Sequence, residues 1–218
     1  MSIASVITQL HSELPSTVKL VAVSKFKPVE DILAAYEAGQ RAFGENRPQE
    51  LAAKAKVLPD DIEWHFIGHL QTNKLKQVLP YAALIQSVDS EHLLTEIDRA
   101  ARAAGRTMDI LLEVHIAAEQ TKQGFTPDEA LALARRIDDF PGVRLRGVMG
   151  MATFTDDSDE VRREFRLLKS ISGQLQAFRP GCDQVSMGMS EDWRIAVEEG
   201  TTIVRIGSAI FGERNYTK

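Results

Sequence analysis

Short apolar runs alternate with amphipathic helical patterns along this chain. The first apolar run, 18–25, ends abruptly on Lys25, and Pro28 then opens a helical pattern that stops at Gly39. Short apolar runs bounded by turn residues are typical of buried strands, whereas apolar residues spaced by three or four positions are typical of helices. The pattern predicts a strand followed by a helix, with a lysine where the strand leaves the core.

The same alternation continues to the end of the chain. Parallel strands need crossover helices, and several of these runs are apolar throughout. Eight strand–helix units predict a single (β/α)8 TIM barrel domain over 1–218, with a doubly wound open sheet as the alternative. After a helix at 1–14, further strands are predicted at 41–46, 62–68, 83–88, 108–116, 145–151, 184–188 and 201–207, and helices at 48–58, 71–79, 89–104, 127–137, 157–178 and 191–199.

Composition narrows the class of protein. Among 218 residues, the net charge of -5 argues against a nucleic-acid or acidic-membrane binder. A single cysteine, Cys182, leaves no intramolecular disulfide and fits a reducing compartment. The N-terminus lacks the pattern of a signal peptide, and no apolar run is long enough to cross a membrane. These features predict a soluble cytoplasmic protein.

Lys25 is the first candidate for chemistry. An amine at the end of a buried strand lies in a partly dry pocket, where desolvation lowers its pKa and frees a nucleophilic lone pair. Such an amine suits Schiff-base formation with an aldehyde. A solvated lysine at a strand end is the alternative interpretation.

Two glycine-containing segments follow the last two predicted strands. In a (β/α)8 barrel, phosphate is often bound by these loops. Segments 186–190 and 205–208 both offer backbone N–H groups and hydroxyls that suit a phosphate, although two turns with capping serines are the alternative. Arg205 would face the same pocket as Lys25. Beside a pyridoxal ring, an arginine keeps the ring nitrogen unprotonated, which disfavours carbanion chemistry.

Other polar strand ends give weaker signals. His65, His69 and His115 are more typical of structural histidines than of ligands, although His65 alternates with Trp64 and Phe66 and so could point into the barrel. The sequence has no metal-binding motif, no P-loop and no GxGxxG fingerprint, so no metal site is predicted.

Five sequence blocks carry a family resemblance. They resemble the YggS/PROSC family of pyridoxal phosphate homeostasis proteins, in family order and over nearly the whole chain. The blocks are VAVSK at 21–25, FGEN at 43–46, HFIGHLQTNK at 65–74, SMGMSED at 186–192 and VRIGSAIFG at 204–212.

The resemblance implies a barrel like the N-terminal domain of alanine racemase, with pyridoxal 5′-phosphate (PLP) as cofactor and Lys25 as its Schiff-base lysine. It also implies that Lys27 and Lys122 are lysines near the site. The family usually has a tyrosine after the GEN block, where this chain has Arg47. The remaining cofactor-binding residues that it implies are Ser186, Gly207 and Ser208 for the phosphate, Arg205 by the ring nitrogen, and Asn46, His65 and Met187 lining the pocket.

No catalytic residue is predicted. A PLP racemase needs a second base opposite the lysine, which alanine racemases take from a tyrosine of a separate β-domain. The chain ends at Lys218, too soon for such a domain, and its three tyrosines are predicted in helices or the tail. We therefore expect a non-enzymatic, monomeric PLP carrier that serves vitamin B6 homeostasis and passes PLP to PLP-dependent apoenzymes. The alternatives are a PLP-dependent racemase or lyase of amino acids, and a cofactor-free Schiff-base aldolase.

Overall fold

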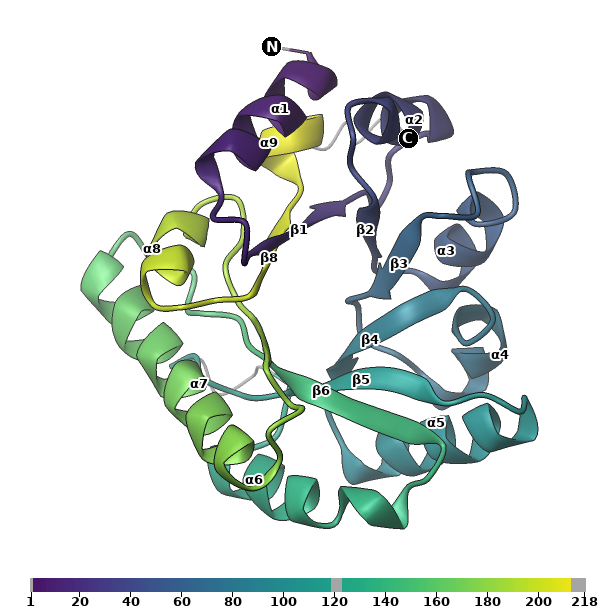
Figure 1. Cartoon of the computed structure of the whole chain (residues 1–218), viewed down its shortest axis with the longest axis vertical. Coiled ribbons are helices and arrows are strands. Elements are labelled where there is room, and N and C mark those ends of the chain that lie inside the picture. The colour runs from purple at the N-terminus through teal and green to yellow at the C-terminus, as the bar shows by residue number, and fades with distance from the viewer. Residues whose placement is uncertain (1, 119–122, 213–218) are drawn as a thin grey trace.

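The strands form where apolar residues are concentrated, and they pair in sequence order. The computed structural model describes residues 2–118 and 123–212. Within these ranges eight strands form a closed parallel barrel, because β8 pairs with β1 as well as with β7 (Figure 1). The (β/α)8 prediction is confirmed, and the open sheet is excluded. The strands are β1 (Lys19–Val23), β2 (Ala42–Glu45), β3 (Glu63–Phe66), β4 (Ala82–Val88), β5 (Met108–Glu113), β6 (Val143–Met149), β7 (Gln184–Ser186) and β8 (Ile203–Ile206).

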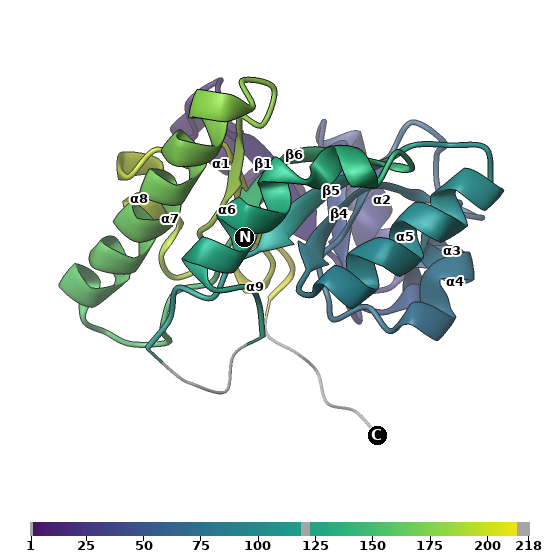
Figure 2. The ribbon, with the colours of Figure 1, turned by 90° about the horizontal axis from the view of Figure 1, so that it is seen from below.

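Helices surround the ring of strands, and Figure 2 shows α5 lying along the outer side of β4 and β5. Polar side chains cap several helix starts, such as Ser90 before α5, Asp157 before α7, and Thr126, which forms a capping box with Glu129 in α6. The helices are α1 (Ile3–Glu13), α2 (Val29–Glu37), α3 (Pro48–Lys54), α4 (Leu75–Val78), α5 (Glu91–Ala103), α6 (Pro127–Arg135), α7 (Ser158–Phe178), α8 (Trp193–Glu198) and α9 (Ser208–Phe211), with short 3-10 turns η1 (Thr72–Lys74) and η2 (Ile137–Asp139).

The strands are buried on both faces. Phe43, Phe66 and other outward residues belong to the large core cluster that includes the helices. A smaller apolar cluster collects alternate strand residues that face the barrel interior: Val21, Ala42, Leu84, Leu111, Met149 and Ile203. Because side chains alternate along a strand, the same inward rows also carry His65, Gln86, Ser186 and Arg205, and all four are buried. The barrel interior therefore has an apolar part and a polar part.

Several predicted boundaries differ from the structure by a few residues. The helix predicted at 71–79 is split into η1 and the short α4. The strand predicted at 108–116 stops at Glu113, because Phe125 then donates its N–H to the Glu113 carbonyl and accepts one from His115. β6 begins at Val143, two residues before the predicted start.

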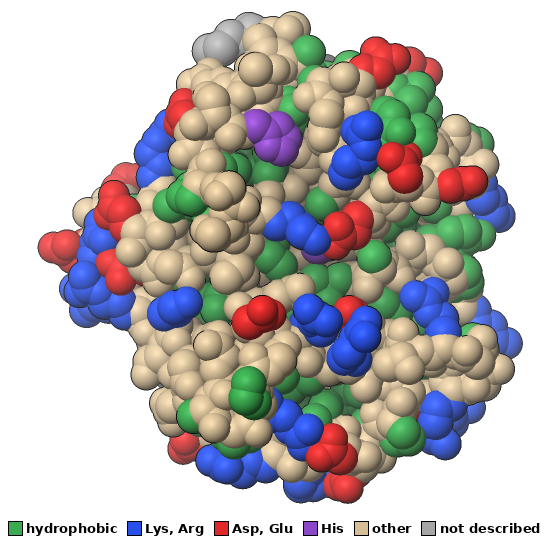
Figure 3. All heavy atoms as spheres, in the orientation of Figure 1, with side chains coloured by type: hydrophobic (Ala, Val, Ile, Leu, Met, Phe, Trp, Pro, Cys, Tyr) green, Lys and Arg blue, Asp and Glu red, His purple; other side chains and the backbone are tan. Residues whose placement is uncertain are grey.

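Three further observations concern surface charge, membrane-spanning helices and metal-binding groups. The face in Figure 3 carries Lys and Arg interspersed with Asp and Glu. Over residues 2–118 and 123–212, no helix combines the length and apolar character needed to cross a bilayer. The same residues contain no group of three or more His, Cys, Asp or Glu side chains placed to bind a metal ion.

Candidate functional site

A cavity of about 750 Å³ opens at the carboxyl ends of the strands. This volume is within the range of small-molecule pockets. It is lined by residues that directly follow β1, β2, β3, β6, β7 and β8, which is where (β/α)8 barrels place their functional sites. The polar lining residues are Lys25, Lys27, Asn46, Thr153, Thr155, Asp156, Ser158, Ser190, Glu191, Asp192, Arg205 and Ser208.

The backbone around Lys25 is held on both sides. The buried Lys54 ammonium donates to the Ser24 carbonyl at 2.8 Å, and the Glu50 carboxylate accepts the Phe26 N–H at 2.8 Å. Phe26 has φ 63°, the only positive φ of a non-glycine among the described residues. These contacts fix the turn that carries the Lys25 side chain into the cavity.

Lys54 is itself fully bonded. Besides the Ser24 carbonyl, it donates to Glu45 at 2.7 Å and to Glu50 at 3.0 Å. Burial raises the pKa of Glu45, and the charge and hydrogen bond of Lys54 oppose that rise. The Ser24 hydroxyl also donates to Glu45, at 2.6 Å. Ion pairs of this kind, buried and hydrogen-bonded on several sides, lock local geometry.

Arg205 reaches the cavity from β8 and is 4% exposed. Its guanidinium donates to the Gly150 carbonyl at 3.0 Å and to the Ser186 hydroxyl at 2.5 Å. Burial lowers the pKa of Arg205 to about 10, against the opposing charges of Asp192 and Glu113. Arg205 is therefore a fixed positive charge in the cavity wall at neutral pH.

The loops after β7 and β8 are joined to each other. The Ser190 hydroxyl accepts hydrogen bonds from the N–H groups of Gly207 at 3.3 Å and Ala209 at 3.4 Å. Gly188 has φ 94°, and a Cβ there would lie 2.6 Å from the Cβ of Ala196, so glycine is required for the turn. The joined loops present Ser190, Gly207 and Ser208 to the cavity.

The Asn46 side chain places an unpaired polar atom at the cavity. Its Oδ1 is buried and has no hydrogen-bond partner among the described residues, while the residue lines the cavity. A Cβ on Gly68 would lie 2.3 Å from the Asn46 carbonyl oxygen, so Gly68 allows β2 and β3 to approach at this point. A buried amide oxygen without a hydrogen-bond partner lowers the free energy of unfolding, and a bound group that donates to it would remove this cost.

Arg47 occupies the position where the family that the sequence resembles usually has a tyrosine. Its guanidinium lies 4.3 Å from the centre of the Phe26 ring, a cation–π contact. Lys27, another residue that the resemblance implies near the site, lines the cavity and donates to the carbonyls of Phe211 at 2.6 Å and Gly212 at 3.2 Å. Lys122 lies outside the described residues.

The structure brings together five of the eight predicted cofactor-binding residues and separates three from them. Lys25, Asn46, Arg205, Gly207 and Ser208 line the cavity. The other three, His65, Ser186 and Met187, are fully buried and do not line it. Of these three, Ser186 adjoins the site, because it accepts a hydrogen bond from Arg205.

Two residues of the site region, Ser190 and Gln86, were not among the predicted cofactor-binding residues, although Ser190 lies in the predicted phosphate segment 186–190. Ser190 lies in the same glycine-containing loop as Ser186, and sequence alone does not tell which serine faces the cavity. Ser186 is the last residue of β7 and points into the barrel, whereas Ser190 lies beyond the strand. Gln86, inside β4, had no motif to mark it; its amide bonds both Ser186 and His65.

The other two histidines at predicted strand ends, His69 and His115, and the single cysteine do not line the cavity. His69 is exposed and bonds Asp89 at 3.0 Å. His115 follows β5, and its Nδ1 is buried with no hydrogen-bond partner in the described part of the chain. Cys182 is buried, and its thiol donates to the Leu145 carbonyl. None of these three residues lines the cavity.

Fold and cavity together define a (β/α)8 barrel with a small-molecule site at the carboxyl ends of its strands. Residues 2–215 match the family described as "Alanine racemase, N-terminal domain". The chain is 40% identical over 200 residues to the pyridoxal phosphate homeostasis protein of Aquifex aeolicus, covering 91% of this chain and 88% of the relative. It belongs to the family of pyridoxal phosphate homeostasis proteins, as the sequence blocks predicted.

Solved structures agree with this assignment. PipY of Synechococcus elongatus, described as having PLP bound, is similar with a TM-score of 0.88 and 37% identity, covering 97% of this chain and all of that chain. An alanine racemase of Clostridium difficile has a TM-score of 0.85 at 13% identity, covering 99% of this chain and 58% of that one. The second comparison shows a shared fold alone.

Glu113, at the carboxyl end of β5, has a perturbed pKa. Burial and the charge of Asp89 raise the pKa of Glu113 to about 7, and the charges of Arg205 and His69 oppose the rise. Between the ordinary value of 4.5 and about 7, the folded protein holds a proton that the unfolded chain releases. The free energy of unfolding contributed by this group therefore falls as pH rises through that window.

We expect Glu113→Gln to match the wild type in stability at pH 5 and to exceed it at pH 8, by up to about 3 kcal/mol. Urea unfolding at both pH values measures the difference. Glu37→Gln, at an exposed position in α2, is the control and should show no such pH-dependent gap. A gap for Glu113→Gln that is the same at pH 5 and pH 8 would contradict the prediction.

Proposed function

We propose that this chain binds PLP in the cavity, with Lys25 bonded to the cofactor's aldehyde carbon, and that it serves PLP homeostasis. The observation that carries the proposal is the meeting of Lys25, Arg205 and the joined loops of Ser190 and Ser208 in one cavity. The names of the relatives and the PLP-bound PipY structure support it.

The residues present fit this cofactor. A phosphate dianion needs several donors, and beside Gly207 the cavity wall offers the Ser208 N–H and the hydroxyls of Ser208 and Ser190. Asn46 supplies a buried acceptor that a hydroxyl on the bound ring would satisfy. Lys25 supplies the amine, and Arg205 a fixed cation.

Arg205 also favours a particular use of the cofactor. PLP supplies an electron sink for bonds at an amino-acid α-carbon, and a protonated ring nitrogen strengthens that sink. A guanidinium is a donor only, so Arg205 beside the nitrogen leaves it unprotonated. This arrangement suits retention of PLP better than deep carbanion chemistry.

We propose further that the protein does not turn over a substrate. The described residues that line the cavity include no tyrosine, which is the residue type that supplies the second base in alanine racemases, and no histidine or cysteine. Tyr36 bonds Asp61 on the outer side, and Tyr81 precedes β4 at the opposite end of the barrel. Tyr216 lies outside the described residues.

The remaining parts of the proposal concern location and partners. We propose a cytoplasmic, single-domain monomer over 1–218, whose cavity is accessible for handing PLP to PLP-dependent apoenzymes. The charge of -5, the single cysteine and the large cavity at one end of the barrel support this view.

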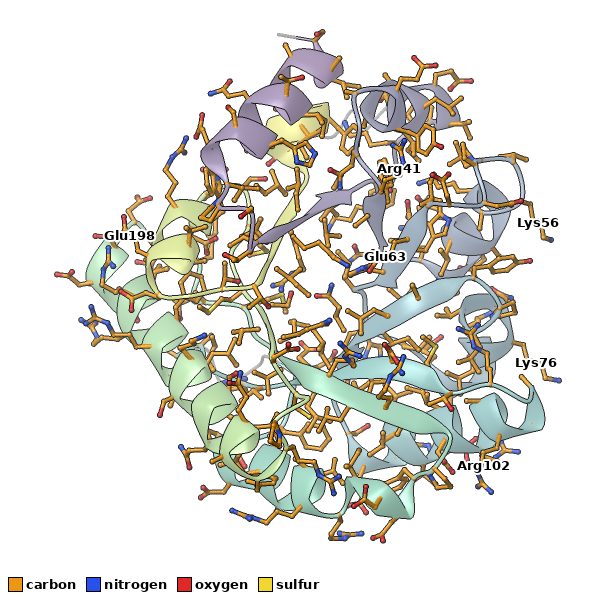
Figure 4. All side chains as sticks on the ribbon, viewed as in Figure 1. Arg41, Lys56, Glu63, Lys76, Arg102 and Glu198 are labelled. Atoms are coloured by element: carbon orange, nitrogen blue, oxygen red, sulfur yellow. The ribbon has the colours of Figure 1, made fainter. Side chains whose placement is uncertain are left out.

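Lys25→Ala tests the covalent site. Wild-type protein incubated with PLP should show a visible absorption band, and borohydride should add the cofactor's mass to the peptide that contains Lys25. Lys25→Ala should lose both signals, because no other cavity amine is proposed to react. Lys56→Ala is a matched control, since Lys56 is exposed just beyond α3 and points away from the barrel (Figure 4).

Labelling of another lysine in wild type, or undiminished labelling of Lys25→Ala, would contradict the covalent assignment. A wild-type protein that takes up no PLP but forms a borohydride-trapped adduct with a keto- or aldo-phosphate would favour the aldolase alternative.

Ser190→Ala and Ser186→Ala distinguish the two candidate phosphate serines. Ser186 was predicted from the resemblance, but its hydroxyl already bonds Arg205 and Gln86, so we propose that Ser190 holds the phosphate. Ser190→Ala should lower the preference for PLP over pyridoxal about tenfold or more, because a hydrogen bond to a charged group contributes ~1.5–3 kcal/mol. Ser186→Ala should leave the PLP-to-pyridoxal affinity ratio unchanged. The reverse pattern in equilibrium titrations would restore Ser186 as the phosphate ligand.

Exchange of a substrate α-deuteron tests the absence of catalysis. PLP-loaded protein incubated with α-deuterated alanine or serine should lose deuterium no faster than an equal concentration of free PLP. Mass spectrometry of the amino acid measures the loss. Steady exchange well above that background, abolished in Lys25→Ala, would identify a PLP-dependent racemase or lyase instead.

A further inference from the structure

A continuous series of hydrogen bonds runs from Arg205 across the barrel interior. Arg205 donates to the Ser186 hydroxyl at 2.5 Å, and Ser186 donates to Gln86 Oε1 at 2.6 Å. Gln86 Nε2 lies 2.7 Å from His65 Nδ1, and His65 Nε2 lies 2.9 Å from Glu63 Oε1. These five residues come from β8, β7, β4 and β3, and we call them the interior chain.

The interior chain has one direction when His65 is neutral, and burial lowers the pKa of His65 and so favours the neutral imidazole. A guanidinium can only donate and a carboxylate can only accept, so each group between Arg205 and Glu63 then accepts on one side and donates on the other. The Gln86 amide donates to His65 Nδ1, and the His65 proton lies on Nε2, which donates to Glu63.

The interior chain connects the two ends of the barrel. Arg205 lines the cavity at the carboxyl end. Glu63 is the first residue of β3 and lies near the middle of the strand ring in Figure 4, where Lys19, the first residue of β1, donates to it at 2.6 Å. Those two side chains are 41% and 38% exposed, whereas His65, Gln86 and Ser186 are fully buried. The interior chain therefore joins a buried cation, Arg205, to a partly exposed ion pair, Glu63 with Lys19.

Proton transfer does not explain this arrangement. A glutamine amide neither gains nor loses a proton in water at ordinary pH, and it interrupts any relay between His65 and Ser186. The remaining role is to hold Arg205 in position. Among the residues that the structure describes, its guanidinium makes one other hydrogen bond, to the Gly150 carbonyl. Two anchors fix a planar guanidinium, whereas one leaves it free to rotate.

We propose that Gln86 and His65 are positioning residues, which through Ser186 hold the Arg205 guanidinium in its orientation toward the cavity. The inference rests on the proposed PLP site only for its consequence, that Arg205 is presented to the cofactor ring. The orientation itself is a property of the protein without cofactor. If these polar residues only satisfied one another's hydrogen bonds, replacing Gln86 would leave the orientation of the Arg205 guanidinium unchanged.

Nuclear magnetic resonance of the cofactor-free protein tests the proposal. In wild type, the His65 nitrogen shifts should show protonated Nε2 and bare Nδ1 at pH 7, and Arg205 should give separate, slowly exchanging Nη–H signals, assigned by their loss in Arg205→Lys. Gln86→Leu should merge or shift the Arg205 signals, because it removes the acceptor of Ser186 and the donor to His65.

Gln40→Leu is the matched control. Gln40 is equally buried, but its amide donates to the carbonyls of Leu20 and Ala42 instead of the interior chain. The control should leave the Arg205 signals unchanged even if it lowers stability. The proposal is overturned if His65 is protonated on Nδ1, if Gln86→Leu leaves Arg205 as in wild type, or if Gln40→Leu moves the Arg205 signals as much. The His65 measurement needs no variant, so it can overturn the proposal even if Gln86→Leu folds poorly.

A titration of the same variants tests the consequence for ligand binding. Gln86→Leu should weaken PLP and pyridoxal by the same factor, about tenfold, because Arg205 is presented to the ring that both share. Gln40→Leu should change either affinity less than about twofold. A wild type that binds neither ligand would refute the proposed function and leave the resonance result intact. Equal affinity of wild type and Gln86→Leu for both ligands would refute the positioning of Arg205 toward the ring.

Discussion

The pairing of β8 with β1 is the constraint on which the site depends. An unclosed parallel sheet would leave the N–H and C=O groups of both edge strands without partners. Closure satisfies them in a fixed register, with Val21 opposite Arg205 and Ala22 opposite Ile206. Residues from opposite ends of the chain are thereby brought to one rim, where Lys25 and Arg205 line the same cavity.

The barrel interior that supports this cavity contains both apolar and polar side chains. Part of it is an apolar cluster that includes Val21, Leu111 and Met149, but the layer nearest Arg205 is polar. Buried polar groups are tolerated only when they are satisfied, and hydrogen bonds that share donors and acceptors in one direction strengthen one another. The polar layer therefore contributes specificity of orientation, which an apolar layer of the same volume would lack.

A second polar cluster, outside the barrel, does for Lys25 what the interior chain does for Arg205. Lys54 and Glu50 bind the peptide groups on either side of Lys25, and Lys54 also neutralises Glu45. Lys25 and Arg205 are thus both held by polar networks whose other members do not line the cavity. Side chains held in this way suit a protein that presents a few groups in a constant geometry around one ligand.

The sequence by itself determined the architecture and the family. Strand and helix periods, the turn residues between them and the five blocks predicted the barrel, Lys25 and Arg205, because these signals are local. It did not determine which polar strand residue reaches the cavity. Strands of a barrel are buried on both faces, so hydrophobic alternation is weak, and the depth of a residue depends on register and closure. Only the tertiary structure could therefore separate Ser190 from Ser186, place His65 below the cavity floor, identify Gln86, and surround Glu113 with the groups that raise its pKa to about 7.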